Sequence, residues 1–171
     1  MIRAAVAADR DAIARLHFDS WRNAYRGMLP DAYIDGALAA DLAADWVHKF
    51  EDLGDHRLIL LAEGKAGVDG FVAMKLADDW AEIDNLHVAW DRRRRGIGRA
   101  LLGVSVPLLE ARGIGRAFLY VFTANAPALG FYDRLGGRRV GRETQELFGH
   151  SVELFRYEWL GLDALRRPNI A

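Results

Sequence analysis

The hydrophobic positions of the first fifty residues recur at the spacing of amphipathic helices. A short extended run at residues 2–6 predicts a first strand, and Asp9 follows it as a residue that can cap a helix through about Tyr25. Within this segment the apolar positions form a partial helical stripe, namely Ile13, Leu16, Phe18, Trp21 and Ala24. A break with glycine and proline at residues 26–31 ends the pattern, and residues 31–50 predict one or two further helices.

From Arg57 onward the pattern changes to short apolar runs that are typical of strands. Candidate strands occupy residues 57–63, 68–77 and 81–88, and a glycine-containing turn separates the first two. Later elements are a helix, a buried strand, a capped helix and a closing hairpin, at residues 98–112, 116–124, 125–136, and 138–147 with 151–159. Pro107 lies inside the first of these helices and should kink it or end it early, because a proline in a helix interior costs about 3 kcal/mol.

The order of these elements predicts the fold class. One strand, helices, three strands, a helix, a strand, a helix and two strands indicate an α/β fold of the mixed α+β kind. We expect a twisted, mixed, mostly antiparallel sheet of about seven strands, flanked by helices. A chain of 171 residues favours one domain, which we assign to residues 1–160, with residues 161–171 as a C-terminal tail.

Composition and charge narrow the function. Hydrophobic residues make up 51% of the chain and charged residues 27%, as in globular proteins. Twenty-three basic and 24 acidic side chains give a net charge of −1, which disfavours nucleic acid as a partner, since phosphate neutralisation normally requires a basic excess. There is no cysteine, so thiolate catalysis and cysteine-based zinc sites are excluded. We find no secretory leader or membrane span in the sequence, and we expect a cytoplasmic protein without membrane contact.

Four consecutive arginines, Arg92 to Arg95, lead directly into Gly96-Ile97-Gly98 and a helical pattern. A helix start carries unpaired backbone N–H groups, and glycine lets the backbone approach an anion without an obstructing Cβ. The spacing matches neither a P-loop nor a dinucleotide fingerprint, because the lysine of the first and the third glycine of the second are absent. A diphosphate cradle and a solvated basic loop that caps a helix both remain open from this stretch alone.

Two motifs in this order resemble those of the GNAT superfamily, the acetyl-CoA-dependent N-acetyltransferases. Residues 93–98 fit the Arg/Gln-x-x-Gly-x-Gly/Ala pattern after a strand at 81–88, and residues 125–132 fit Asn-x-x-Ala-x-x-Phe-Tyr. The resemblance extends over residues 1 to about 160. Trp90 departs from it, because many relatives have a proline at this place, and so does Gly137, where an aromatic residue is frequent.

The resemblance implies a GNAT-like fold and acetyl-CoA as the acyl donor. It also implies that two parts of the chain contact this cofactor, the end of the strand and the turn that follows, with Asn125 as a third contact. The cofactor residues that we carry over are Leu86, His87, Val88, Arg93, Arg94, Arg95, Gly96, Ile97, Gly98, Arg99 and Asn125. The backbone of Leu86 to Val88 would pair with the pantetheine arm and direct one amide at the thioester oxygen.

Tyr132 is the candidate general acid. It lies seven residues after Asn125, close to two helical turns, so both side chains emerge on one helix face. A phenol with an ordinary pKa near 10 is protonated at neutral pH and can donate to the leaving thiolate. A half-buried aromatic residue that only packs beside Phe131 would look the same in sequence.

Glu82 is the candidate general base, because it matches an acidic strand residue that some family members use. Simple alternation would place Glu82 and Asp84 on the same side of the strand as Leu86, but a bulge frequent in this family would change that register. A solvated or ion-paired carboxylate is the alternative for Glu82. We interpret His87 and the other scattered histidines as structural, and their spacing predicts no metal site.

The acceptor site is expected among the aromatic residues near the first helix, chiefly Trp21, Tyr25 and Tyr33, with Trp80 and Phe148 as further candidates. Nearby carboxylates could receive a cationic amine together with these rings, namely Asp19, Asp31 and Asp35. An ordinary half-buried helix pair would show the same pattern.

The favoured function is transfer of an acetyl group to a primary amine of a small molecule or peptide. A non-catalytic acyl-CoA-binding module is the main alternative, and a nucleic-acid binder is a weaker one. The acceptor stays open, and so does a homodimer, which is frequent among proteins that resemble this chain.

Overall fold

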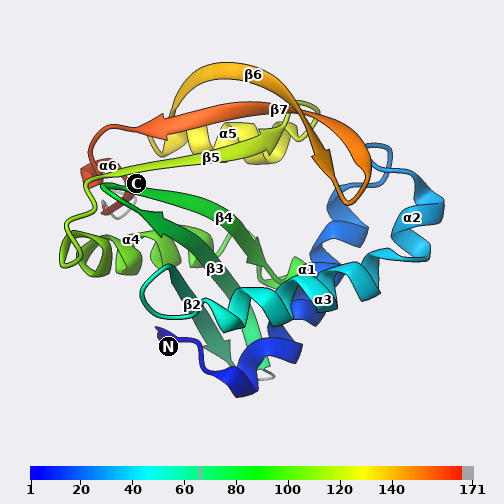
Figure 1. The fold of residues 1–171 in the computed structure, drawn as a ribbon, viewed down its shortest axis with the longest axis horizontal. Helices are drawn as coiled ribbons and strands as arrows, with labels where there is room; N and C mark the ends of the chain where they lie inside the picture. The colour runs from blue at the N-terminus through cyan, green and yellow to red at the C-terminus, as the bar shows by residue number, and fades with distance from the viewer. Residues whose placement is uncertain (66, 167–171) are drawn as a thin grey trace.

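The computed structural model describes residues 1–65 and 67–166 (Figure 1). Within these residues it contains a seven-stranded sheet with the strand order β1-β2-β3-β4-β5-β7-β6. Neighbouring strands are antiparallel except β4 and β5, which are parallel. The strands are β1 (Ile2–Ala4), β2 (Arg57–Gly64), β3 (Gly67–Ala77), β4 (Trp80–Val88), β5 (Arg116–Phe122), β6 (Arg138–Leu147) and β7 (His150–Trp159). The predicted mixed, mostly antiparallel sheet is confirmed.

Helices cover both faces of this sheet, as Figure 1 shows. The longer ones are α1 (Arg10–Ala24), α3 (Leu38–Glu51), α4 (Ile97–Glu110) and α5 (Ala126–Arg134), and the short ones are α2 (Asp31–Asp35) and α6 (Asp163–Arg166). Helices α1 and α3 bury Ile13, Leu16 and Trp46 against one face of β2 and β3. The helices α4 and α5 lie in the core on the opposite face. The segment at residues 31–50 therefore holds two helices.

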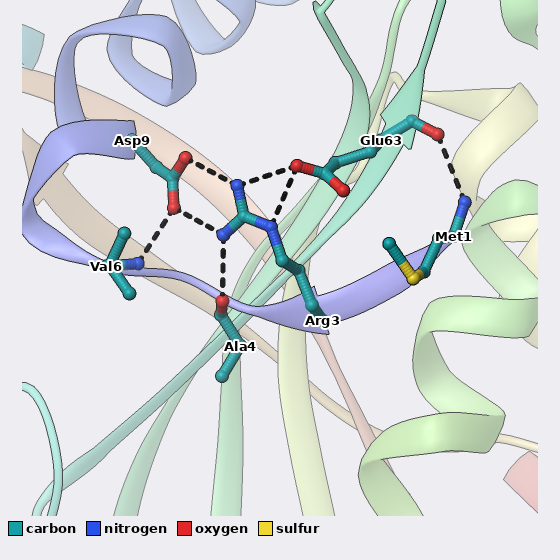
Figure 2. A network of polar contacts seen from close by, with 6 residues as sticks. All are labelled: Met1, Arg3, Ala4, Val6, Asp9 and Glu63. Carbon is teal, nitrogen blue, oxygen red and sulfur yellow. Dashed lines mark hydrogen bonds and ion pairs between the residues drawn. The ribbon is translucent and has the colours of Figure 1, made fainter.

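The chain start is fixed by a polar network that the sequence did not reveal (Figure 2). Arg3 binds both carboxylate oxygens of Asp9 at 2.7 and 2.9 Å and the carboxylate of Glu63 in β2 at 2.8 Å. Asp9 also accepts the N–H of Val6 at 2.8 Å, which closes a short 3-10 helix, η1 (Ala7–Asp9). Asp9 is the N-cap residue of α1, as predicted, but its side chain makes no capping hydrogen bond to that helix, because the carboxylate already binds Val6 and Arg3.

Helix α4 continues through Pro107 to Glu110, so the expectation that this proline ends the helix early is wrong. A mid-helix proline costs about 3 kcal/mol. The same helix buries four apolar side chains completely, and each contributes roughly 1.5–3 kcal/mol. Burial along the whole length of α4 thus outweighs one lost hydrogen bond.

The end of the described chain packs onto α4. Residues 161–166, which we assigned to a tail, contain α6, and Leu162 and Leu165 are buried in the core. Residues 167–171, the remainder of that tail, lie outside the described residues.

An extra residue in β4 sets which side chains face each side of the sheet. Ala73 of β3 pairs with Asn85, whereas the next residue, Met74, pairs with Ile83, so Asp84 is bulged. Leu86 consequently packs in the α4 core, as Ile83 does. The change of register expected from the family bulge is confirmed, and simple alternation, which would group Leu86 with Glu82, does not hold.

Beyond this bulge β4 and β5 separate. Their pairing covers only three positions, from Trp80 with Arg116 to Glu82 with Phe118. Figure 1 shows the two strands diverging, with β4 running toward α1 and β5 staying beside β7. From Ile83 onward the edge of β4 that faces β5 has no strand partner among the described residues, and its backbone groups stay available.

Candidate active site

A cavity of about 1290 Å³ opens where β4 and β5 separate. Its walls come from α1, α3, the end of β4, the start of α4, β5 and α5. It includes nearly all of the residues that the motifs predicted for cofactor and catalysis, namely Glu82, Leu86, His87, Val88, Arg93, Arg94, Gly96, Ile97, Gly98, Arg99, Asn125 and Tyr132. Arg95 is not among its lining residues. The structure therefore brings together two motifs that lie almost thirty residues apart.

The turn before α4 presents its backbone to this cavity. Arg94 has a φ of 61° and Gly96, the N-cap of α4, has a φ of 78°. Left-handed residues close together in a turn direct successive N–H groups into one concavity, which suits an anion. Gly96 has open space where a Cβ would stand, and a Cβ on Gly98 would lie 3.6 Å from the ring of Phe131. A helix start with this backbone conformation is suited to binding an anion.

The four arginines point in different directions. Arg92 pairs with Asp69 and Asp91, each at 3.4 Å, whereas Arg94 and Arg95 are exposed. The guanidinium of Arg93 lies over the ring of Trp90 at 4.3 Å and reaches the hydroxyl of Ser20 in α1 at 3.5 Å. The run is consequently not one continuous basic face of the kind that tracks a nucleic-acid backbone.

Helix α5 carries the second motif. The side chain of Asn125 caps this helix by accepting the N–H of Ala128 at 3.3 Å, which agrees with the predicted cap. About two helical turns further along, Tyr132 is buried and borders the cavity. Burial, and to a lesser degree the neighbouring Tyr25, raises the pKa of Tyr132. Its phenol therefore stays protonated at neutral pH and is available as a proton donor.

Two carboxylates of β4 differ in their surroundings. Burial by itself would raise the pKa of Asp84, but the charges of Lys49, Lys75 and Arg57 outweigh burial and lower it. Lys49 and Arg57 each contact Asp84 at 3.1 Å. Glu82 has one ion-pair contact, with Lys75 at 3.4 Å, and borders the cavity. Asp84 is thus committed to structure, whereas Glu82 remains the better candidate for proton transfer.

The side chain of His87 is part of a buried polar row. Its Nδ1 lies 2.8 Å from the hydroxyl of Ser20, and its ring centroid lies 4.5 Å from that of His17. The Nδ1 of His17 in turn accepts the indole N–H of Trp46 at 3.0 Å. Burial, together with Arg93 and Lys49, lowers the pKa of His87 to about 3, so the imidazole is neutral in ordinary buffers. Such a group is a poor base, in agreement with its structural interpretation.

The aromatic residues predicted for the acceptor divide into two groups. Trp21 and Tyr25 line the cavity, as Phe148 does. Tyr33 and Trp80 are not among the lining residues. The hydroxyl of Tyr33 donates to Asp41 at 2.8 Å.

The predicted carboxylates also lie elsewhere. Asp31 and Asp35 both bind Arg26, and Asp19 is exposed outside the cavity. The acidic groups that do line the cavity are Asp45, Glu82 and Asp84.

Sequence reasoning missed several polar residues of the cavity wall, among them Ser20, Lys49 and Asn85. Lys49 donates to Asn85 at 2.6 Å from a different element. Ser20 had a usable signal, since it lies three residues after His17, on the same face of α1. No equivalent signal links Lys49 with Asn85, which are 36 residues apart.

Two classes of feature are absent from the part of the chain that the structure describes. In residues 1–65 and 67–166, histidine and acidic side chains form no cluster of three or more able to hold a metal ion. The helices in these ranges also lack the combined length and apolarity that a membrane crossing requires.

The fold and a helix start suited to an anion are compatible with an acyltransferase, and comparison with known proteins identifies the family. Residues 15–137 match the model of the acetyltransferase (GNAT) family. The chain belongs to this family, whose members are acyltransferases that use acetyl-CoA.

Proteins with similar sequences are named as acetyltransferases. The chain is 26% identical over 170 residues to YuaI, an uncharacterized N-acetyltransferase of Bacillus subtilis strain 168, covering 96% of this chain and 95% of the relative. A mycothiol acetyltransferase of Clavibacter michiganensis subsp. michiganensis is 41% identical over 92 residues, which cover 53% of this chain but only 30% of the relative. The ribosomal protein bS18-alanine N-acetyltransferase of Salmonella typhimurium is 33% identical over 55% of this chain and 65% of its own length.

Solved structures share the fold. The PaiA N-acetyltransferase of Thermoplasma acidophilum, crystallised with coenzyme A, superposes with a TM-score of 0.70 and 21% identity, over 93% of this chain and 98% of the other. A GCN5-related N-acetyltransferase structure from Rhodopseudomonas palustris gives a TM-score of 0.75 at 21% identity, over 92% and 93% of the two chains.

Proposed function

We propose that this protein transfers an acetyl group from acetyl-CoA to a primary amine of a small molecule or peptide, by direct attack in a ternary complex. The observation that carries the proposal is the separation of β4 from β5. It opens one cavity that reaches both the amide-rich turn before α4 and the phenol of Tyr132. The cavity has room for two reactants side by side, and holding both in place removes much of the entropic cost of a bimolecular step.

The cofactor side is built from backbone more than from side chains. The amides of residues 94–98 would hold the diphosphate, with Arg94, Arg95 and Arg99 adding positive charge near it. The free edge of β4 at Leu86, His87 and Val88 would pair with the amides of the pantetheine arm. Asn125 could offer the NH₂ of its side chain to the same arm, because its oxygen is used in the helix cap.

Acetyl-CoA supplies the thioester carbonyl that the amine attacks and the thiol that leaves. The chain has to remove one proton from the amine and deliver one to the departing sulfur. Glu82, directly or through water, is our candidate to accept the first. Tyr132 donates the second, and its raised pKa favours re-protonation before the next turnover. A backbone amide of β4 would stabilise the negative charge that develops on the carbonyl oxygen.

Two measurements test the proposal. Calorimetry should show acetyl-CoA binding, and an assay of free thiol release with a panel of amines should show turnover above the rate of spontaneous hydrolysis. Binding without amine-dependent thiol release would instead favour an acyl-CoA-binding module without catalysis.

A further inference from the structure

Arg93 differs from the other arginines of its run in where its guanidinium lies. It packs over Trp90 and reaches the hydroxyl of Ser20, so it is half-buried between the end of β4 and α1. It also borders the cavity. Arg94 and Arg95, by contrast, are exposed.

No carboxylate forms an ion pair with Arg93 in the part of the chain that the structure describes. Its neighbours there are a hydroxyl and an indole ring, with the phenol of Tyr25 close enough to affect its charge. Burial lowers the pKa of Arg93, and Tyr25 only partly opposes this effect. A charge withdrawn from water normally has a partner of opposite sign, as Arg57 has in Asp84. The missing partner of Arg93 is therefore expected on a ligand.

The position of Arg93 favours the acceptor over the cofactor as the source of that anion. The side chains around its guanidinium, Ser20 and Tyr25, belong to the α1 side of the sheet. The amide turn leads into α4, which packs on the opposite face. Tyr25 also influences the pKa of Tyr132, so the guanidinium and the proposed general acid border the same region. An anion bound by Arg93 would lie close to the reacting amine.

The rest of this region is apolar. Trp21 and Tyr25 contact each other with ring centroids 4.9 Å apart, and Tyr25 contacts Phe122 at 4.5 Å. Phe148 adds a ring 6.1 Å from that of Trp21. These rings line the same cavity as Arg93 and suit an apolar body.

Building on the proposed function, we infer that the acceptor is a primary amine with a carboxylate beside it and an apolar body, as in a hydrophobic amino acid. Arg93 binds the carboxylate through its guanidinium, with Ser20 as a supporting contact, and the aromatic rings enclose the apolar body. Arg93 is thus a specificity-determining residue, while the backbone of its turn serves the cofactor.

Matched acceptors test this inference in the thiol-release assay. L-Phenylalanine is compared with phenylalaninamide and phenethylamine, and L-leucine with leucinamide and 3-methylbutylamine. For the wild type, kcat/KM should be about 10-fold or more higher with each amino acid than with the two analogues that lack the carboxylate. A ratio of this size corresponds to the free energy of one charge-assisted hydrogen bond. Arg93→Gln should bring that ratio close to one, and this change should exceed any effect on the dissociation constant of acetyl-CoA. Arg22→Gln removes an exposed arginine of α1 and should preserve the ratio.

Binding without turnover gives an independent readout. In the presence of coenzyme A, calorimetry should show that 3-phenylpropanoate binds to the wild type. Two control titrations should give little heat: 3-phenylpropanamide with the wild type, and 3-phenylpropanoate with Arg93→Gln. Binding that depends on Arg93, without turnover of any amine, would support the anion site and contradict the proposed catalysis.

Four results would overturn the inference. The uncharged partners could react as well as the acids, or the wild type could fail to bind 3-phenylpropanoate. Arg93→Gln could weaken acetyl-CoA binding without changing the acceptor ratio, which would assign Arg93 to a cofactor phosphate. A uniform loss of kcat for every acceptor would assign it to the transition state instead. Amine-dependent thiol release in any of these cases would leave the proposed function standing.

Discussion

The hydroxyl of Ser20 joins α1 to the end of β4 through a hydrogen bond of 2.8 Å to Nδ1 of His87. Arg93 donates to the same hydroxyl at 3.5 Å. Burial lowers the pKa of His87 to about 3, so the imidazole that Ser20 contacts is neutral. The strand that would guide the pantetheine arm is thus held by an uncharged histidine.

This arrangement predicts a loss of stability in mild acid. The pKa of His87 is about 3 in the folded protein against an ordinary value of 6.5, so the unfolded chain binds the proton first. Its contribution to stability is fully present above pH 6.5 and is lost as the pH falls toward 3. Urea unfolding across this window should show a shallower decline for His87→Gln than for the wild type. His48→Gln, at an exposed histidine, should follow the wild type, and equal slopes for all three proteins would contradict the assignment.

Tyr132→Phe should lower turnover far more than cofactor affinity. The substitution keeps the ring in the core and removes the proton donor, so we expect kcat to fall by about 100-fold, at the lower end for lost general acid catalysis. The matched control is Tyr157→Phe, since that ring lies 6.0 Å from Tyr132 but its hydroxyl binds Asp133. An unaltered kcat in Tyr132→Phe would remove this residue from the acid role.

Gly96 should tolerate asparagine but not valine. Its φ of 78° lies in the left-handed region, which costs ordinary residues about 1–2 kcal/mol and which asparagine adopts more readily than most. A valine that shifts the turn would misdirect the amides of the cradle, and acetyl-CoA affinity should fall by about 10-fold or more. Calorimetry measures the change. Gly113→Val provides the control, because that glycine has a φ of 77° just beyond the other end of α4. Equal cofactor affinity in both valine variants would show that the cradle does not depend on this conformation.

Local patterns explain why the elements and both motifs could be predicted. The cap of α5 by Asn125 and the glycine turn before α4 depend on neighbours within a few residues. The bulge at Asp84 was anticipated only through the family resemblance, because the ion pairs of this residue with Lys49 and Arg57 join elements far apart in the sequence.

Ion pairing explains why part of the acceptor site could not be predicted. Trp21 of α1 and Tyr25 at the end of this helix line the cavity, whereas Asp31 and Asp35 of α2 do not. Arg26 binds both Asp31 and Asp35 and keeps them at the surface. Sequence spacing does not show whether these two carboxylates pair with Arg26 or face the aromatic rings of the cavity.

The bulge itself should depend on Asp84. Its carboxylate is mostly buried between Lys49 and Arg57, and removing one partner of such a group typically costs about 3 kcal/mol or more because the remaining charges lose their counter-ion. Asp84→Asn should therefore lower the free energy of unfolding by roughly this amount at neutral pH.

The pKa of Asp84 is lowered below its ordinary 3.8, so its contribution to stability is present above pH 3.8 and is lost as the pH falls through the folded value. The gap between Asp84→Asn and the wild type, measured by urea unfolding, should accordingly narrow below pH 3.8. Asp55→Asn, at an exposed position, should match the wild type throughout. If Asp84→Asn were as stable as the wild type at neutral pH, the three cations around the bulge could not be what fixes its position.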